Sequence, residues 1–253
     1  MTDSGGRDRT TRDERRREAR SRRLEAERRA ARARRNRWIA GVLAALAVVG
    51  IAAFALTRPK EPSEAEARAS ALLASSAAGA AAAGCTQVRA VGAYQPSELD
   101  RAHVGSDLVS AMPPLASYPS QPPASGPHAD STLPAGVYAS PPPIDQLIHS
   151  LEHGAAIVWY APDALGELAE LQDFYRDPLV GSRVIVAPYD YPDEGEAGSL
   201  GPGVEMALVS WHHVQTCSQV NLAAAFGFTA RYAFPTFGRE RYLGTAPEPG
   251  API

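Results

Sequence analysis

Two histidines and two carboxylates fall within one short stretch, residues 144–154, which reads Ile-Asp-Gln-Leu-Ile-His-Ser-Leu-Glu-His-Gly. His149 and His153 are spaced i and i+4, so on a helix both imidazoles lie on one face and can bind one metal ion. Glu152 lies between them, and Asp145 lies one turn before His149, where it can orient that ring from outside the coordination shell. These residue types at this spacing predict a candidate metal site.

A third candidate ligand comes from outside the stretch. His128 ends a Ser-Gly-Pro-His turn at residues 125–128. Three histidines with an open position suit zinc or copper, because both ions accept imidazole nitrogen. The alternative is structural: histidine has a donor and an acceptor, and both can serve proline-rich loops that have few backbone partners. The sequence leaves both interpretations open.

The string His-x-x-Glu-His at residues 149–153 also matches the bare form of an inverted zinc-protease motif, with Glu152 as the candidate catalytic residue. Those enzymes need a larger domain and a further carboxylate ligand downstream, and here Gly154 follows the motif at once. A metal-dependent hydrolase is therefore the least favoured function. The sequence favours a non-enzymatic role and does not exclude catalysis.

The element that must carry these side chains is a short amphipathic helix. Its apolar positions follow the helical spacing i, i+3, i+4 and i+7, at Ile144, Leu147, Ile148 and Leu151. Three prolines precede it, and Gly154 is expected to end it. Apolar runs at residues 155–161, 184–189 and 204–211 predict three buried strands.

Two more helices are predicted after the first strand. One carries Leu168, Leu171 and Tyr175, and the last carries Leu222 and Phe226 after a Ser218 cap. This order of elements predicts one globular α+β or α/β domain around a small mixed sheet. A thioredoxin-like topology is an alternative, although the chain has no Cys-x-x-Cys motif.

An uncharged apolar segment separates this domain from a basic N-terminus. Residues 38–57 are long enough to span a bilayer, and they predict one transmembrane helix. Residues 58–84 are rich in Ala, Ser and Gly and are expected to be a partly helical linker. The globular domain is expected to cover residues 85–244, and a Pro/Gly-rich tail at 245–253 is expected to be disordered.

The basic segment, residues 1–37, holds 15 arginines against 7 acidic residues. By the positive-inside rule it stays in the cytoplasm, and the domain lies on the other side of the cell membrane. A cleaved signal peptide is the competing interpretation, but the arginine-rich region and the apolar run are both long for one. Interleaved glutamates indicate a solvated charged helix rather than a clamp for phosphates. The adjacent membrane span favours attraction to anionic membrane lipid over binding of nucleic acid.

The chain has two cysteines, Cys85 and Cys217, and both lie on the predicted outer side. Oxidising compartments favour disulfides, so we expect the two to pair. Two free thiols or two metal ligands are the alternatives.

Several of these strings together resemble a bacterial family, the domain of unknown function 3105. They are Pro122-Pro-Ala-Ser-Gly-Pro-His128, Gly136-Val-Tyr138, His149-Ser-Leu-Glu-His-Gly154, Trp211 and Cys217. His212 departs from the pattern, which has glycine after the tryptophan. The resemblance implies a single-pass membrane protein with the domain after the anchor, and it implies no activity.

Taken together, the sequence predicts a membrane-anchored extracytoplasmic domain that binds a metal ion through His128, His149 and His153. A non-catalytic domain that interacts with the cell envelope, with the same residues as a buried polar network, is the alternative. The identity of a protein partner is left open.

Overall fold

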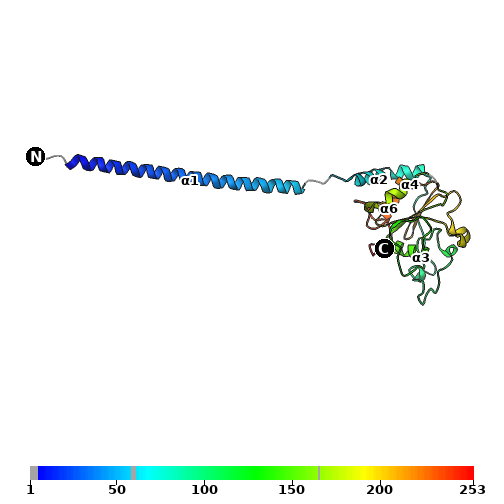
Figure 1. Ribbon diagram of the computed structural model, residues 1–253. Helices are drawn as coiled ribbons and strands as arrows, with labels where there is room; N and C mark the ends of the chain where they lie inside the picture. Colours follow the sequence, from blue (N-terminus) through cyan, green and yellow to red (C-terminus); the bar gives the residue numbers. More distant parts are fainter. Residues whose placement is uncertain (1–4, 58–60, 165) are drawn as a thin grey trace. The chain divides into compact units, whose positions relative to one another are not determined.

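The computed structural model describes residues 5–57, 61–164 and 166–253 (Figure 1). The first four residues of the predicted basic segment and residues 58–60 of the predicted linker lie outside the described residues. The chain forms two compact units, residues 1–61 and residues 62–253, and each is considered by itself.

The first unit is a single helix, α1 (Gly5–Thr57). It carries the uncharged segment, and its side chains there are exposed, with Trp38 at 71%. Residues Glu14–Ala55 contain a window that is long and apolar enough to cross a membrane. By length and composition alone this helix can serve as a membrane span or as a signal anchor.

The second unit is built on one six-stranded mixed sheet with the order β1-β6-β5-β3-β4-β2. Its strands are β1 (Arg89–Ala90), β2 (Gly136–Val137), β3 (Ala156–Tyr160), β4 (Val184–Pro188), β5 (Met206–Ser210) and β6 (His213–Cys217). The central strand β3 pairs in parallel with β4 and antiparallel with β5, and every residue of these three strands is buried. The predicted α+β class and the three predicted strands are confirmed.

The four longest strands follow the order β6-β5-β3-β4, with β5 antiparallel to the other three. This is the strand order of a thioredoxin-like core. The connection from β4 to β5 holds a 3-10 segment, η3 (Pro192–Gly198), at the place where such a core has a helix. The thioredoxin-like topology therefore stays a prediction for this chain.

Two hydrophobic clusters lie on the two faces of the sheet. Val158 points into the cluster under α6 (Leu222–Tyr232), and its neighbour Trp159 points into the cluster under α3 (Ile144–Glu152), because successive strand residues face opposite sides. The remaining helical elements are α2 (Glu64–Ala82), α4 (Leu168–Tyr175), α5 (Pro178–Gly181), η1 (Ser97–Leu99) and η2 (Leu115–Ser117). The helix α3 and the proline-rich loops thus cover the same face of the sheet.

Most of the predicted linker is a helix that packs against the domain in the structure. Residues 64–82 form α2, which starts with a Ser63–Glu66 capping box and lies against α6 (Figure 1). Small residues allow this: Ala69 and Ser76 are buried, and Ser76 lies against Gly227 of α6. The last helix begins at Leu222 with Asn221 as its cap, while Ser218 donates to the Ala83 carbonyl instead.

The predicted disordered tail also differs. Residues 245–253 run past the end of α3, where the Glu248 amide donates to the Glu152 carbonyl and the Gly250 amide donates to the His153 carbonyl. These bonds satisfy carbonyls that the end of a helix leaves without partners. We call residues 245–253 the C-terminal segment.

Gly227→Ala tests the contact between α2 and α6. A Cβ at this position would lie 2.3 Å from the Ser76 Cβ, so the two helices must separate. We expect a loss of about 1–3 kcal/mol from overpacking, offset in part by the better helix propensity of alanine. Gly201→Ala is the matched control, because its Cβ would meet nothing within 4 Å. Thermal unfolding followed by tryptophan fluorescence measures both; equal melting temperatures would contradict the packing.

Candidate metal centre

The helix α3 presents one face to the core and the other to the loops. Leu147, Ile148 and Leu151 are at most 1% exposed and pack onto the sheet. The opposite face carries His149 and Glu152, and His153 follows as the C-cap residue. Gly154 ends the helix with a φ of 88°, a conformation that favours glycine. The sequence predicts both the helix and this division of its faces.

His128 comes from a loop that is held by a buried carboxylate. Asp100 accepts from the Ser125 hydroxyl at 2.7 Å and from the Tyr94 amide at 2.6 Å, and its other oxygen is 2.8 Å from His212 Nε2. The Asp100 carbonyl accepts from the Gly126 amide. Burial alone would raise the pKa of Asp100, but these hydrogen bonds outweigh it and lower the pKa. Asp100 therefore fixes the turn that precedes His128.

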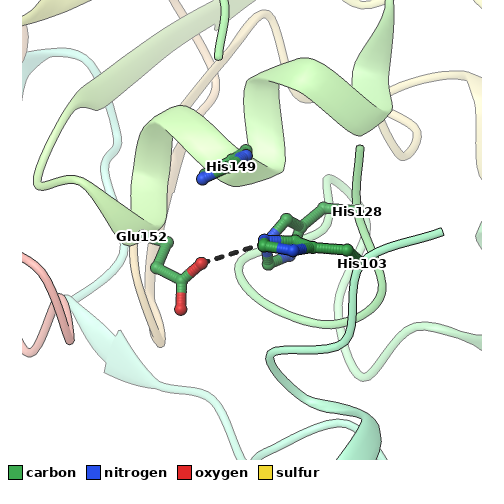
Figure 2. A group of neighbouring side chains, drawn as sticks. All are labelled: His103, His128, His149 and Glu152. Atoms are coloured by element: carbon green, nitrogen blue, oxygen red, sulfur yellow. Dashed lines mark ion pairs between the residues drawn. The ribbon is translucent and has the colours of Figure 1, made fainter. Parts of the chain in front are cut away.

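The candidate site is a cluster of four side chains, which we call the inner cluster: His103, His128, His149 and Glu152 (Figure 2). Their candidate ligand atoms all lie within 4.8 Å of one another. His128, His149 and Glu152 are buried, and His103 is exposed. His103 reaches the cluster because residues 103 and 128 lie side by side in a parallel bridge. The described His and Glu side chains thus converge from α3 and two loops.

Backbone carbonyls fix the orientation of three imidazoles. The Nδ1 atom of His128 is 2.8 Å from the Gly126 carbonyl, that of His149 is 2.8 Å from the Ala129 carbonyl, and that of His153 is 2.6 Å from the Pro252 carbonyl. A carbonyl can only accept, so each Nδ1 carries the proton and donates it. In a neutral ring the Nε2 atom then keeps its lone pair, which is the form of histidine that binds metals.

The Nε2 atom of His128 is fully buried and has no hydrogen-bond partner among the described residues. It lies 3.0 Å from Glu152 Oε2, but the contact does not have hydrogen-bond geometry. The two atoms form an ion pair when His128 carries a proton on Nε2, as marked in Figure 2. A proton on this nitrogen or a metal ion between the nitrogen and the carboxylate oxygen would satisfy both atoms.

Glu152 is only 2% exposed, and Arg101 bonds to its Oε1 through Nε. Burial alone would raise the pKa of this carboxyl, but the adjacent His128 and Arg101 outweigh burial and lower the pKa to about 2. Glu152 is thus ionised at neutral pH. The Nη2 atom of the Arg101 guanidinium is 2.6 Å from Glu248 Oε1 in the C-terminal segment.

His149 and His153 meet through their ring nitrogens, with 3.0 Å between the two Nε2 atoms. Burial lowers the pKa of His149, and the neighbouring His128 and His153 lower it further. His149 is therefore neutral at pH 7, and its Nε2 accepts. Because both rings donate from Nδ1, the contact between their Nε2 atoms requires a shared cation, either a proton or a metal ion.

The structure places the predicted site residues as follows. His128 and His149 lie together, with 4.8 Å between ring centroids, and His153 adjoins His149. Asp145 was predicted to orient His149, and this stays a prediction. The Ala129 carbonyl accepts from His149 Nδ1, and the Ala129 amide donates to the Asp145 carbonyl.

Sequence reasoning missed His103 and Arg101 as parts of the site. Both lie in an irregular loop where residue spacing has no fixed meaning in space. The signal that could have found His103 is composition: it is one of only six histidines in the chain, and three of the others were already assigned to the site.

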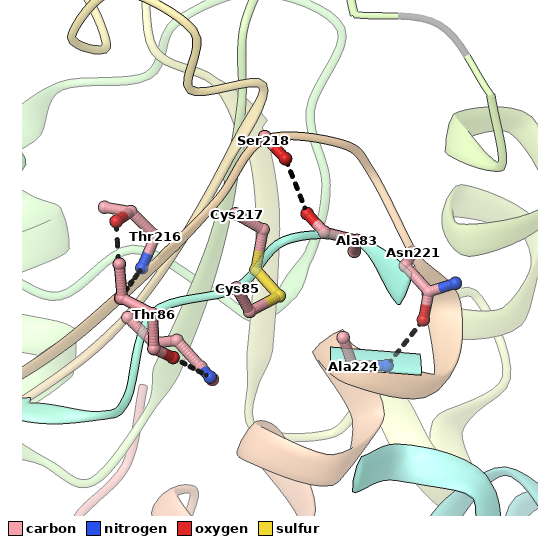
Figure 3. Close-up of a disulfide and its surroundings, with 9 residues drawn as sticks. Ala83, Cys85, Thr86, Thr216, Cys217, Ser218, Asn221 and Ala224 are labelled. Atoms are coloured by element: carbon pink, nitrogen blue, oxygen red, sulfur yellow. Dashed lines mark hydrogen bonds between the residues drawn. A yellow bond between two sulfur atoms is a disulfide. The ribbon is translucent and has the colours of Figure 1, made fainter. Parts of the chain in front are cut away.

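Cys85 and Cys217 are joined by a disulfide in the structure (Figure 3). Hydrogen bonds flank it, since Thr86 and Thr216 bond to each other and the Ser218 hydroxyl donates to the Ala83 carbonyl. The crosslink ties the end of α2 to the end of β6 across 132 residues of sequence. In a chain-entropy estimate, a loop of that length stabilises the fold by about 5 kcal/mol.

Comparison with known families gives one match. Residues 112–246 match the family described as Protein of unknown function (DUF3105). The chain belongs to this family. Neither the curated proteins nor the solved structures give a match. The matched region of DUF3105 includes His128, His149, Glu152 and His153, whereas Arg101, His103 and Glu248 lie outside it.

Asp100→Asn tests the support of the His128 loop. The pKa of Asp100 is lowered in the folded protein, so its stabilisation is present above the unfolded pKa of about 3.9 and is lost as the pH falls through the folded value. We expect the variant to lose about 1–3 kcal/mol at pH 7 and to differ less from the wild type below pH 3. Urea unfolding at both pH values measures this, with the exposed Asp107→Asn as control. A pH-independent difference would contradict the role of the charge.

Proposed function

We propose that this protein is a membrane-anchored, extracytoplasmic metal-binding protein, and that a divalent transition-metal ion, zinc or copper, binds at the inner cluster. His128 and Glu152 form the core of the site, with His149 and His103 beside them. The inner cluster is the place in this domain where candidate ligand atoms for a metal ion gather. Membership of DUF3105 points to no activity, so the proposal rests on the geometry of the cluster.

The observation that carries the proposal is the buried Nε2 of His128, which has no hydrogen-bond partner among the described residues and lies 3.0 Å from Glu152 Oε2. An unpaired buried polar atom costs about 1–3 kcal/mol, and an ion between the two atoms would remove that cost. Imidazole nitrogen and carboxylate oxygen are ligands that zinc and copper both accept.

The donor atoms can surround one ion if the side chains of the cluster move closer together. Two donors bound to a tetrahedral zinc ion at about 2.1 Å lie about 3.4 Å apart, close to the 3.0 Å between His128 Nε2 and Glu152 Oε2. The candidate ligand atoms of the cluster lie up to 4.8 Å apart, so the side chains must close by roughly 1.4 Å around a tetrahedral ion.

The geometry gives little support to hydrolysis with Glu152 as general base. A general base works best with a pKa near the working pH, and the pKa of Glu152 is about 2. Its Oε1 is already held by Arg101. A structural role is the second candidate, because Arg101 joins Glu152 to Glu248 and so fastens the C-terminal segment to α3.

We also infer that α1 anchors the protein in the cell membrane with its N-terminus in the cytoplasm. The uncharged half of the helix is long enough to span, and the arginine-rich half favours the cytoplasmic side and anionic lipid headgroups. The disulfide supports an oxidising location for the domain.

The metal proposal is tested with the full chain, purified in detergent and dialysed against zinc or copper. We expect at least one equivalent of one of these metals per chain, measured by mass spectrometry of the elements. His128→Ala and Glu152→Gln each remove a ligand, so affinity should fall by more than about 100-fold, beyond the effect of losing an outer-shell partner.

His213→Ala is the matched control, because the ring of His213 lies against Tyr232 and not in the cluster. It should bind metal as the wild type does. Less than one tenth of an equivalent of either metal in the wild type, with the fold intact by circular dichroism, would reject metal binding and favour the structural role.

Orientation is tested with single cysteine reporters at Ser21 in α1 and at Ser140 in the domain, both exposed positions. In intact spheroplasts a membrane-impermeant maleimide should label Ser140→Cys, while Ser21→Cys should react only after lysis, because arginine-rich flanks stay inside. The reverse pattern would contradict the proposed orientation. A membrane-bound mature chain that lacks residue 21 would show a cleaved signal peptide.

A further inference from the structure

We propose that the domain binds a second metal ion beside the first, at an outer position formed by His149, His153 and Glu248 of the C-terminal segment. The inference rests on the proposed function, because the inner position must hold an ion for a second one to adjoin it. With both positions filled, His149 serves the outer ion, and the inner ion keeps His103, His128 and Glu152.

Arg101 bonds to one oxygen of Glu152 and to one oxygen of Glu248. Its Nε donates to Glu152 Oε1, and its Nη2 donates to Glu248 Oε1 at 2.6 Å. The other oxygen of each carboxylate faces a histidine: Glu152 Oε2 is 3.0 Å from His128 Nε2, and Glu248 Oε2 is 3.7 Å from His153 Nε2. One guanidinium thus directs two carboxylate oxygens toward two imidazoles.

At the outer position, as at the inner one, imidazole nitrogens lie close to a carboxylate oxygen. The His153 ring donates from Nδ1 to the Pro252 carbonyl, and the His149 ring donates from Nδ1 to the Ala129 carbonyl. Their Nε2 atoms face each other at 3.0 Å, with a carboxylate oxygen 3.7 Å from one of them. These distances bracket the separation of about 3.4 Å expected between two ligands of one tetrahedral ion.

The C-terminal segment is held firmly enough to supply a ligand. The Glu248 and Gly250 amides donate to carbonyls at the end of α3, and Arg183 donates to the carbonyls of Gly250 and Ala251. The backbone on both sides of the Glu248 side chain is therefore fixed. A ligand on a fixed backbone binds without a large ordering cost.

The six donors divide into two equal sets, each with two imidazoles and one carboxylate. Three protein ligands leave open coordination positions on each ion, and adjacent ions with open positions are the arrangement of two-metal sites. Two divalent ions exceed the charge of two glutamates, and Arg101 adds positive charge. Repulsion between the ions should therefore make the second ion bind more weakly than the first.

Zinc titration of the full chain in detergent, followed by calorimetry, tests the second position. We expect the wild type to bind two ions in two steps and Glu248→Gln to bind one, with the tighter step retained. Glutamine keeps a hydrogen bond to Arg101 but loses the carboxylate. Glu240→Gln is the matched control, since Glu240 pairs with Arg231 and has no role in the site. His153→Ala should also bind one ion.

Cobalt(II) supplies a second readout, because its visible spectrum depends on the ligands. The second equivalent of cobalt should give a spectrum in the wild type that Glu248→Gln lacks. One zinc ion in the wild type overturns the second position and leaves the proposed function standing. Two ions in Glu248→Gln, or none, overturn the outer ligand set. No zinc or cobalt in the wild type overturns both proposals.

Discussion

A carboxylate buried among imidazoles requires positive charge close to it. Glu152 is such a carboxylate, and the contacts around the site depend on how its charge is balanced. Arg101 supplies positive charge from one side, and the half-exposed guanidinium also binds Glu248. Through these ion pairs three segments that are distant in sequence meet at the end of α3. The loops can be proline-rich and irregular because their positions are fixed by polar contacts to a few buried groups, Asp100 and Glu152 above all.

The strands of the sheet that are buried on both faces were predictable from the sequence, because they are runs of apolar residues. β3, β4 and β5 are buried along their whole length, and each is a continuous apolar run. β6 was not found, because His213, Gln215 and Thr216 interrupt its apolar residues. The edge strands β1 and β2 have two residues each, which is too short for any periodic signal.

The site was predictable only where helical spacing or a local motif joined its residues. The i and i+4 spacing brought His149 and His153 onto one face, and the turn at residues 125–128 singled out His128. Arg101, His103 and Glu248 are joined to the site by loop contacts that no spacing rule describes. The C-terminal segment shows the reason: its composition correctly indicates a lack of regular structure, but its amides still pair with α3 carbonyls.

The disulfide has a consequence for how the domain stays attached to the N-terminal helix. Cys85 lies just after α2, and Cys217 lies 132 residues later, so most of the proline-rich loops fall inside the covalent ring. A single proteolytic cut in those loops leaves two fragments that are still joined through the two sulfur atoms. Release of the domain from the N-terminal helix therefore requires either a cut before Cys85 or a cut between the two cysteines combined with reduction. Because α2 packs on α6, the exposed residues 61–63 are the segment before Cys85 that is most open to such a cut.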